Sequence, residues 1–81
     1  MNRKAILNEL QHLFQETLLN DDLVISEETE IDAIEEWNSL TNMQVMIALE
    51  QKYGVKFGLR DIAGWSVIGD MIDSIDKKMN A

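Results

Sequence analysis

A regular spacing of apolar side chains near the start of the chain most strongly limits what this sequence can fold into. Between residues 2 and 19, six apolar residues recur at intervals of three or four: Ile6, Leu7, Leu10, Leu13, Phe14 and Leu18. This interval places them on one face of an α-helix, and that face must be buried against another element. Asn2 is a residue type that commonly caps a helix start. The spacing therefore predicts an amphipathic helix over residues 2–19.

Two later segments also have helical character. Residues 39–53 are apolar around much of their circumference, and Lys52 followed by Gly54 is typical of a helix C-terminus. Ser66 is expected to cap a last helix that reaches about residue 78, with Gly69 closely packed against a neighbour. The inward side chains of this helix are expected to be Val67, Ile68, Met71, Ile72, Ile75 and Met79.

Between these segments the sequence predicts one long loop and one short helical turn. Residues 20–38 form the loop, which holds eight of the fifteen acidic residues, and the short turn is expected at residues 60–63. The loop also contains apolar residues that indicate packing onto the helices: Leu23, Val24, Ile25, Ile31 and Ile34. It lacks the spacing and the glycine of a calcium-binding loop, so no metal site is expected. The predicted fold class is all-α, a small bundle of three longer helices plus one short helix, with a long first loop.

Length and charge narrow the classes of function. The 81 residues are expected to form a single domain over residues 1–81, and its modest core favours a binding or carrier role over a deep active site. The net charge of -8 argues against nucleic acid, which requires a basic surface, and favours basic protein partners. The chain has no cysteine, no signal-peptide pattern and no long apolar run. We expect a cytoplasmic monomer that does not enter a membrane.

The segment Trp37-Asn38-Ser39-Leu40 closes the acidic loop and opens the second long helix. A serine here has its hydroxyl beside the free N–H groups and the positive dipole end of a helix, which favour a phosphate group. An ordinary capping serine occupies the same kind of position. The residues alone leave both interpretations of Ser39 open.

This segment and the sequence that follows it resemble the acyl carrier protein family, and the resemblance covers nearly the whole chain. The matching stretches are Trp37-Asn38-Ser39-Leu40, residues 45–57 (V-M-I-A-L-E-Q-K-Y-G-V-K-F), Arg60-Asp61-Ile62, residues 65–70 (W-S-V-I-G-D) and Ile72. The resemblance implies that a separate phosphopantetheinyl transferase attaches a 4'-phosphopantetheine arm from coenzyme A to Ser39. The thiol of the arm would hold acyl groups as thioesters. It further implies a non-catalytic carrier whose other partners are acyl-activating and acyl-transfer enzymes.

The sequence departs from the family pattern in two ways. The aspartate that usually precedes the serine is Asn38, which flanks the site and is expected to help orient it, but which lacks the charge. The second helix contains one acid, Glu50, so partner contacts are expected to depend more on apolar side chains than on charge. The expected partner-binding residues are Leu40, Met43, Ile47 and Glu50. Core packing of Met43 or Ile47 is the alternative. These departures favour a specialised lipid or secondary-metabolite pathway.

Other functions remain open at this point. One is an unmodified carrier-like module that binds basic proteins, and another is an aminoacyl carrier of the D-alanyl type. A peptidyl carrier is disfavoured because the glycine pair typical of that class is missing before Ser39. A hydrolase that uses Ser39 with His12 is not expected, since the sequence has no G-x-S-x-G motif. In the acyl carrier interpretation, the core between the second helix and residues 60–65 shelters the tethered chain.

Overall fold

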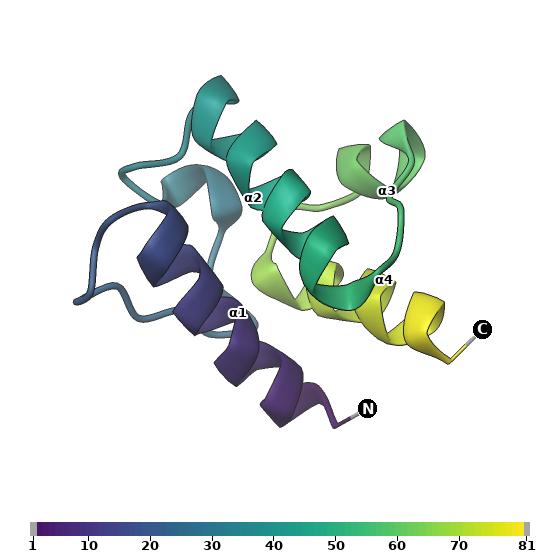
Figure 1. Cartoon of the computed structure of the whole chain (residues 1–81). Coiled ribbons are helices and arrows are strands. Elements are labelled where there is room, and N and C mark those ends of the chain that lie inside the picture. Colours follow the sequence, from purple (N-terminus) through teal and green to yellow (C-terminus); the bar gives the residue numbers. More distant parts are fainter. Residues whose placement is uncertain (1, 81) are drawn as a thin grey trace.

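The computed structural model describes residues 2–80, so positions 1 and 81 of the expected domain lie outside the described residues. Its elements are α1 (Arg3–Thr17), a 3-10 turn η1 (Ile31–Ala33), α2 (Ser39–Tyr53), the short α3 (Leu59–Ala63) and α4 (Ile68–Met79). Figure 1 shows α1, α2 and α4 as the long helices of the bundle, with α3 beside α2 and α4. The predicted all-α bundle, with three longer helices, a short one and a long first loop, is confirmed.

The core is built from the apolar faces that the periodicity predicts. Ile6, Leu10 and Phe14 of α1 are fully buried, as are Val45 and Leu49 of α2. The buried residues of α4 are Ile68, Gly69, Met71, Ile72 and Ile75. The loop contributes Ile25, Ile31 and Ile34, which confirms that it packs on the bundle. Val24 is the exception, because 77% of its surface is exposed.

Backbone hydrogen bonds join the first loop to the beginning of α4. The N–H of Ile68 donates to the Thr29 carbonyl at 3.0 Å, and the N–H of Gly69 donates to the Glu27 carbonyl at 2.9 Å. A Cβ atom added at Gly69 would lie 3.1 Å from that same Glu27 oxygen. The close packing expected at Gly69 is therefore confirmed, and it lets the loop lie directly against the helix.

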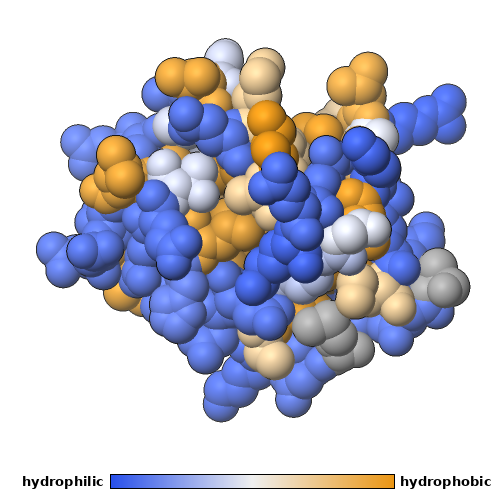
Figure 2. All heavy atoms as spheres, in the orientation of Figure 1, coloured by the Kyte–Doolittle hydropathy of each residue, from blue (hydrophilic) through white to orange (hydrophobic). Residues whose placement is uncertain are grey.

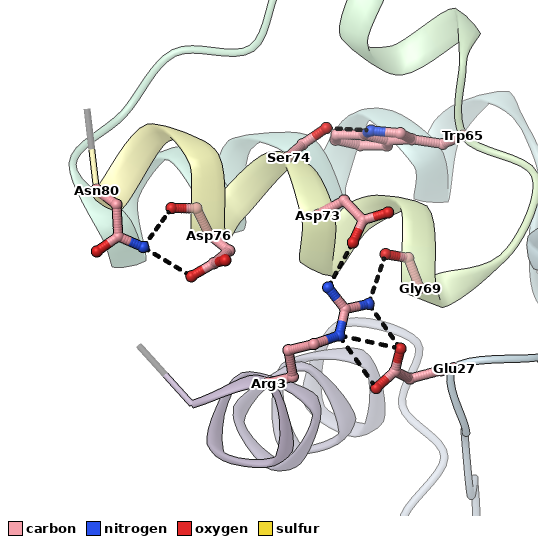
Figure 3. Close-up of polar contacts among 8 residues, drawn as sticks. All are labelled: Arg3, Glu27, Trp65, Gly69, Asp73, Ser74, Asp76 and Asn80. Atoms are coloured by element: carbon pink, nitrogen blue, oxygen red, sulfur yellow. Dashed lines mark hydrogen bonds and ion pairs between the residues drawn. The ribbon is translucent and has the colours of Figure 1, made fainter.

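Arg3 adds a side-chain connection between α1, the loop and α4 (Figure 3). Its guanidinium contacts the Glu27 carboxylate at 2.6 Å, the Asp73 carboxylate, and the Gly69 carbonyl at 3.3 Å. Hydrogen bonds to the two carboxylates hold the pKa of Arg3 above its ordinary value. The arginine thus links the start of the chain to the segment on which α4 begins.

The end of α1 differs from the prediction, because the helix stops at Thr17 and not at Leu19. Leu19 adopts a left-handed backbone conformation with φ of 56°. The N–H of Asn20 then donates to the Gln15 carbonyl at 3.0 Å. This is a Schellman-type termination, in which the left-handed residue is usually glycine. The periodic pattern continues into Leu18 and gives no sign of this stop.

The beginning of α4 also differs, and the predicted cap by Ser66 is wrong. The helix starts at Ile68, with Val67 in the capping position. The Asp70 carboxylate accepts hydrogen bonds from the N–H groups of Ser66 at 2.8 Å and Val67 at 3.1 Å. These bonds lower the pKa of Asp70. At the other end, Met79 is 41% exposed, so its predicted inward position is also wrong.

The short helix α3 has no fully buried residue, although Ile62 packs partly against the core, and contacts of its neighbours help to hold it. Phe57 and Trp65 meet edge to face, with ring centroids 5.2 Å apart. The Trp65 Nε1 donates to Ser74 Oγ of α4 at 2.8 Å (Figure 3). Lys78 Nζ lies 3.5 Å from an Asp61 carboxylate oxygen. The helical turn predicted at residues 60–63 is confirmed, beginning one residue earlier.

Candidate functional site

The first turn of α2 is fixed by a reciprocal set of hydrogen bonds between Asn38 and Thr41. Asn38 Oδ1 accepts from the N–H groups of Leu40 at 2.9 Å and Thr41 at 3.0 Å. In return, Thr41 Oγ1 accepts from the Asn38 N–H at 2.8 Å and donates to the Glu36 carbonyl at 2.8 Å. The cap of α2 is therefore Asn38, as its residue type allows. The role of Thr41 was not predicted, because a capping box usually has glutamate or glutamine at that position.

Ser39 is the first residue of α2, and its side chain is not used to cap the helix. The residue is exposed, and its hydroxyl makes no hydrogen bond with any residue in the described range 2–80. The capping interpretation of Ser39 is therefore wrong. Because Asn38 performs that function, the Ser39 hydroxyl is available at the surface for another use.

The N–H groups beside Ser39 are less available to an anion than the sequence suggested. Two donors of the first turn, those of Leu40 and Thr41, are already bonded to Asn38 Oδ1. The Ser39 N–H, by contrast, has no acceptor among residues 2–80. A phosphate bonded to Ser39 Oγ would therefore have one free N–H and the positive end of the α2 dipole close to it. The site fits a serine-linked phosphodiester.

Packing against α1 holds the approach to Ser39 in place. The Trp37 ring stacks on the fully buried Phe14, with centroids 5.8 Å apart and planes inclined by 8°. The Asn20 amide donates to the Glu36 carboxylate at 2.8 Å. The consecutive residues Glu36 and Trp37 are thus attached to α1 and to the segment that follows it, so the exposed serine projects from a fixed segment.

An open surface depression lies beside the Ser39 hydroxyl. It is lined by Asp32, Trp37, Asn38, Ser39 and Asn42. Asp32 comes from η1 and places a carboxyl-bearing residue next to a site that lacks an aspartate at position 38. This neighbour is not predictable from the chain order, because Asp32 lies seven positions before Ser39 and the fold of the loop brings the two together.

The predicted partner-binding residues differ in how accessible they are. Leu40, Met43 and Ile47 are 64%, 62% and 50% exposed, so the alternative of core packing does not hold for Met43 or Ile47. Figure 2 shows hydrophobic side chains at the surface over the beginning of α2 and over α3. Glu50 is half-buried, and its carboxylate accepts the Phe57 N–H at 3.0 Å. This acid therefore serves the connection between α2 and α3.

Two other features are absent from the described residues 2–80. No helix in this range has both the length and the apolar character needed to cross a membrane. No group of three or more histidine, cysteine, aspartate or glutamate side chains in this range is arranged to hold a metal ion.

Known proteins resemble this chain over most of its length. The family model described as a phosphopantetheine attachment site matches residues 8–75. The solution structure of holo acyl carrier protein from Geobacter metallireducens is similar, with a TM-score of 0.85 and 32% identity over 91% of this chain and 85% of that chain. The search of curated proteins found no significant match to the sequence. The chain therefore belongs to the acyl carrier protein family, and its cofactor is a covalently attached 4'-phosphopantetheine.

Proposed function

We propose that Ser39 is the attachment residue, and that the protein carries acyl groups as thioesters on its 4'-phosphopantetheine arm for delivery to partner enzymes. The observation that carries this proposal is the division of roles at the start of α2. Asn38 and Thr41 make the capping hydrogen bonds, whereas the hydroxyl of Ser39 is exposed and makes no hydrogen bond with residues 2–80. A serine with no structural use at this position is free to be modified.

The attachment reaction places few demands on the chain itself. Ser39 Oγ loses its proton to a base of the transferase and bonds to the phosphorus of coenzyme A that carries the pantetheine. The bond from that phosphorus to the oxygen bridging the two phosphates breaks, and adenosine 3',5'-bisphosphate leaves with the bonding electrons. The chain contributes position, through Asn38 and the Trp37–Phe14 stack, and a favourable helix terminus for the negative phosphodiester. Once attached, the arm supplies the thiol that holds the acyl group.

The proposed partners are a phosphopantetheinyl transferase and enzymes that activate and transfer acyl groups. The exposed apolar residues Leu40, Met43 and Ile47 support contacts along α2 that depend little on charge. Glu50 remains a candidate contact, although its carboxylate is shared with the Phe57 N–H. The scarcity of acids on α2 favours a specialised lipid or secondary-metabolite pathway. We assign shelter of the tethered chain to the core between α2 and residues 60–65, and no catalytic step to the carrier.

Intact-mass measurement tests this proposal directly. The protein is incubated with a broad-specificity phosphopantetheinyl transferase and coenzyme A, and it should gain the mass of one phosphopantetheinyl group. The Ser39→Ala variant should gain none, whereas Ser66→Ala, which alters another exposed serine, should be modified like the native chain. No mass gain with several transferases would overturn the proposal in favour of an unmodified interaction module. Loading of the modified protein by a D-alanine ligase, and not by acyl-activating enzymes, would instead identify an aminoacyl carrier.

A further inference from the structure

The segment that follows α1 presents apolar side chains to solvent in a way that the fold itself does not require. A turn closed by the Leu23 N–H and the Asn20 carbonyl, 3.2 Å apart, spans residues 20–23. The residues on either side of it, Leu19 and Val24, are 91% and 77% exposed. The turn is held to α1 by Gln15, whose side-chain amide donates to the Leu23 carbonyl at 2.8 Å. A fixed turn thus carries two outward apolar side chains.

Leu19 is the more unusual of the two. Its φ of 56° places a branched side chain in the left-handed region, which costs free energy for any residue with a Cβ atom. Because the side chain is almost fully exposed, no packing within the protein compensates for this cost. A bulky residue kept in an unfavourable conformation at the surface points to a role outside the fold.

The turn lies at the same end of the molecule as the attachment site. The Asn20 amide is bonded to the Glu36 carboxylate at 2.8 Å, and Glu36 is three residues before Ser39. The stack of Phe14 on Trp37 joins the last turn of α1 to the same segment before Ser39. Figure 1 shows the end of α1 and the beginning of α2 in the same part of the bundle. An enzyme that reaches Ser39 can therefore touch this turn at the same time.

The exposed acids of the turn indicate the chemistry of such a partner. Asp21 and Asp22, at the tip of the turn, are both exposed and lie between Leu19 and Val24 in the chain. By contrast, α2 contains a single acid, Glu50, and its carboxylate is bonded to the backbone of Phe57. Negative charge that can attract a basic partner is therefore found on the turn more than on α2.

We propose that residues 19–24, which we name the α1 turn, form a second docking surface for the phosphopantetheinyl transferase. Leu19 and Val24 enter an apolar socket on the enzyme, and lysine or arginine side chains around that socket face Asp21 and Asp22. The inference rests on the proposed attachment of the arm to Ser39. It assigns part of the electrostatic recognition to the turn, in addition to Asp32 beside Ser39. The exposed apolar residues Leu40, Met43 and Ile47 of α2 complete the contact.

The test compares kcat/KM for transfer from coenzyme A to the full chain, with the broad-specificity transferase as the probe. Leu19→Asn keeps a residue that tolerates the left-handed conformation, so the turn is retained. Its kcat/KM should fall about tenfold, as expected when a buried leucine contact is lost. Met79→Asn, at the far end of α4, removes another exposed apolar side chain and should leave the rate unchanged. The double variant Asp21→Asn with Asp22→Asn should show a weaker dependence of kcat/KM on salt.

The outcomes separate this inference from the proposed function. Unchanged kcat/KM for Leu19→Asn, with Ser39 still fully modified, would overturn the docking surface and leave the attachment site intact. An equal loss for Met79→Asn would also overturn it, because the effect would not be local. A native dimer in sedimentation velocity that Leu19→Asn dissociates would assign the surface to a second copy of the chain instead. Absence of any mass gain in the native protein would count against the attachment proposal itself.

Discussion

Replacing Leu19 with glycine should make the protein more stable, although the change removes a large apolar side chain. The side chain is 91% exposed, so little buried surface is lost when it is deleted. Its backbone, with φ of 56°, lies in the region that only glycine adopts without a steric penalty. The substitution therefore tests whether conformational strain at the end of α1 outweighs the contacts that leucine makes there.

The size of the effect follows from two opposing terms. The left-handed conformation costs a residue with a Cβ atom about 1–2 kcal/mol, and glycine removes this cost. Glycine also gives the unfolded chain more freedom, which reduces stability by about 0.5–1 kcal/mol. The free energy of unfolding should therefore rise by about 0.5–1 kcal/mol. For a domain of this size, that corresponds to an increase in Tm of about 2–8 °C.

Gly54 provides the matched control, because it ends α2 in the same conformation, with φ of 64°. A Cβ atom added there would have no heavy atom within 4 Å, so Gly54→Ala changes the backbone preference and creates no clash. The same two terms now act with opposite sign, and the free energy of unfolding should fall by about 0.5–1 kcal/mol. The double variant should unfold near the native midpoint, since effects at separated sites are roughly additive.

Urea unfolding followed by far-ultraviolet circular dichroism measures all four proteins, with the midpoint and slope fitted to a two-state transition. The expected order of midpoints is Leu19→Gly, then the native chain and the double variant together, then Gly54→Ala. A lower midpoint for Leu19→Gly than for the native chain would refute the reasoning. It would mean that the leucine side chain stabilises the fold by more than its backbone conformation costs.

Three further predictions concern the ends of α2 and α4. Asn38→Asp keeps the capping oxygen and adds a charge beside Ser39, so the initial rate of mass gain with transferase and coenzyme A should rise; an unchanged rate would show that the charge is not used. Thr41→Val removes the acceptor for the Asn38 N–H and the donor to the Glu36 carbonyl. The free energy of unfolding in urea should therefore fall by about 0.5–1.5 kcal/mol. No change would contradict the cap described for α2. Hydrogen bonds from the N–H groups of Ser66 and Val67 lower the pKa of Asp70 in the folded protein below its ordinary value of 3.8. The charged carboxylate therefore stabilises the fold above pH 3.8, and this contribution is lost as the pH falls through the folded pKa. Asp70→Asn should therefore be less stable than the native chain at pH 7 and nearly equal to it in strong acid, and a difference that is constant with pH would argue against this role.

The sequence predicted helix ends correctly where a local signal marks them. Residues 39–53 were expected to form the second helix, and α2 spans Ser39–Tyr53 because Asn38 caps its start and Gly54 provides the left-handed residue after its end. The end of α1 was missed because leucine gives no indication that it will adopt the conformation found at Leu19. Local signals therefore predict an end only when the residue type matches the backbone it must adopt.

The start of α4 and part of the candidate site depend on contacts that a local pattern does not contain. Ser66 is a good capping residue, yet the Asp70 carboxylate takes up the N–H groups at this position. The position of Ser39 was predicted, but its freedom from capping depends on the partnership of Asn38 with Thr41. The placement of Asp32 in the same depression depends on how the loop packs and was not predictable from the chain order.

The most direct test of the central claim is to locate the modification within the chain. After reaction with transferase and coenzyme A, the protein is digested, and fragment-ion mass spectrometry assigns the phosphopantetheinyl group to a residue. We predict that it is found on Ser39 and is absent from the other three serines, Ser26, Ser66 and Ser74. A phosphopantetheinyl group on one of these other serines, or a mass gain that persists in Ser39→Ala, would contradict the assignment of Ser39 as the attachment residue.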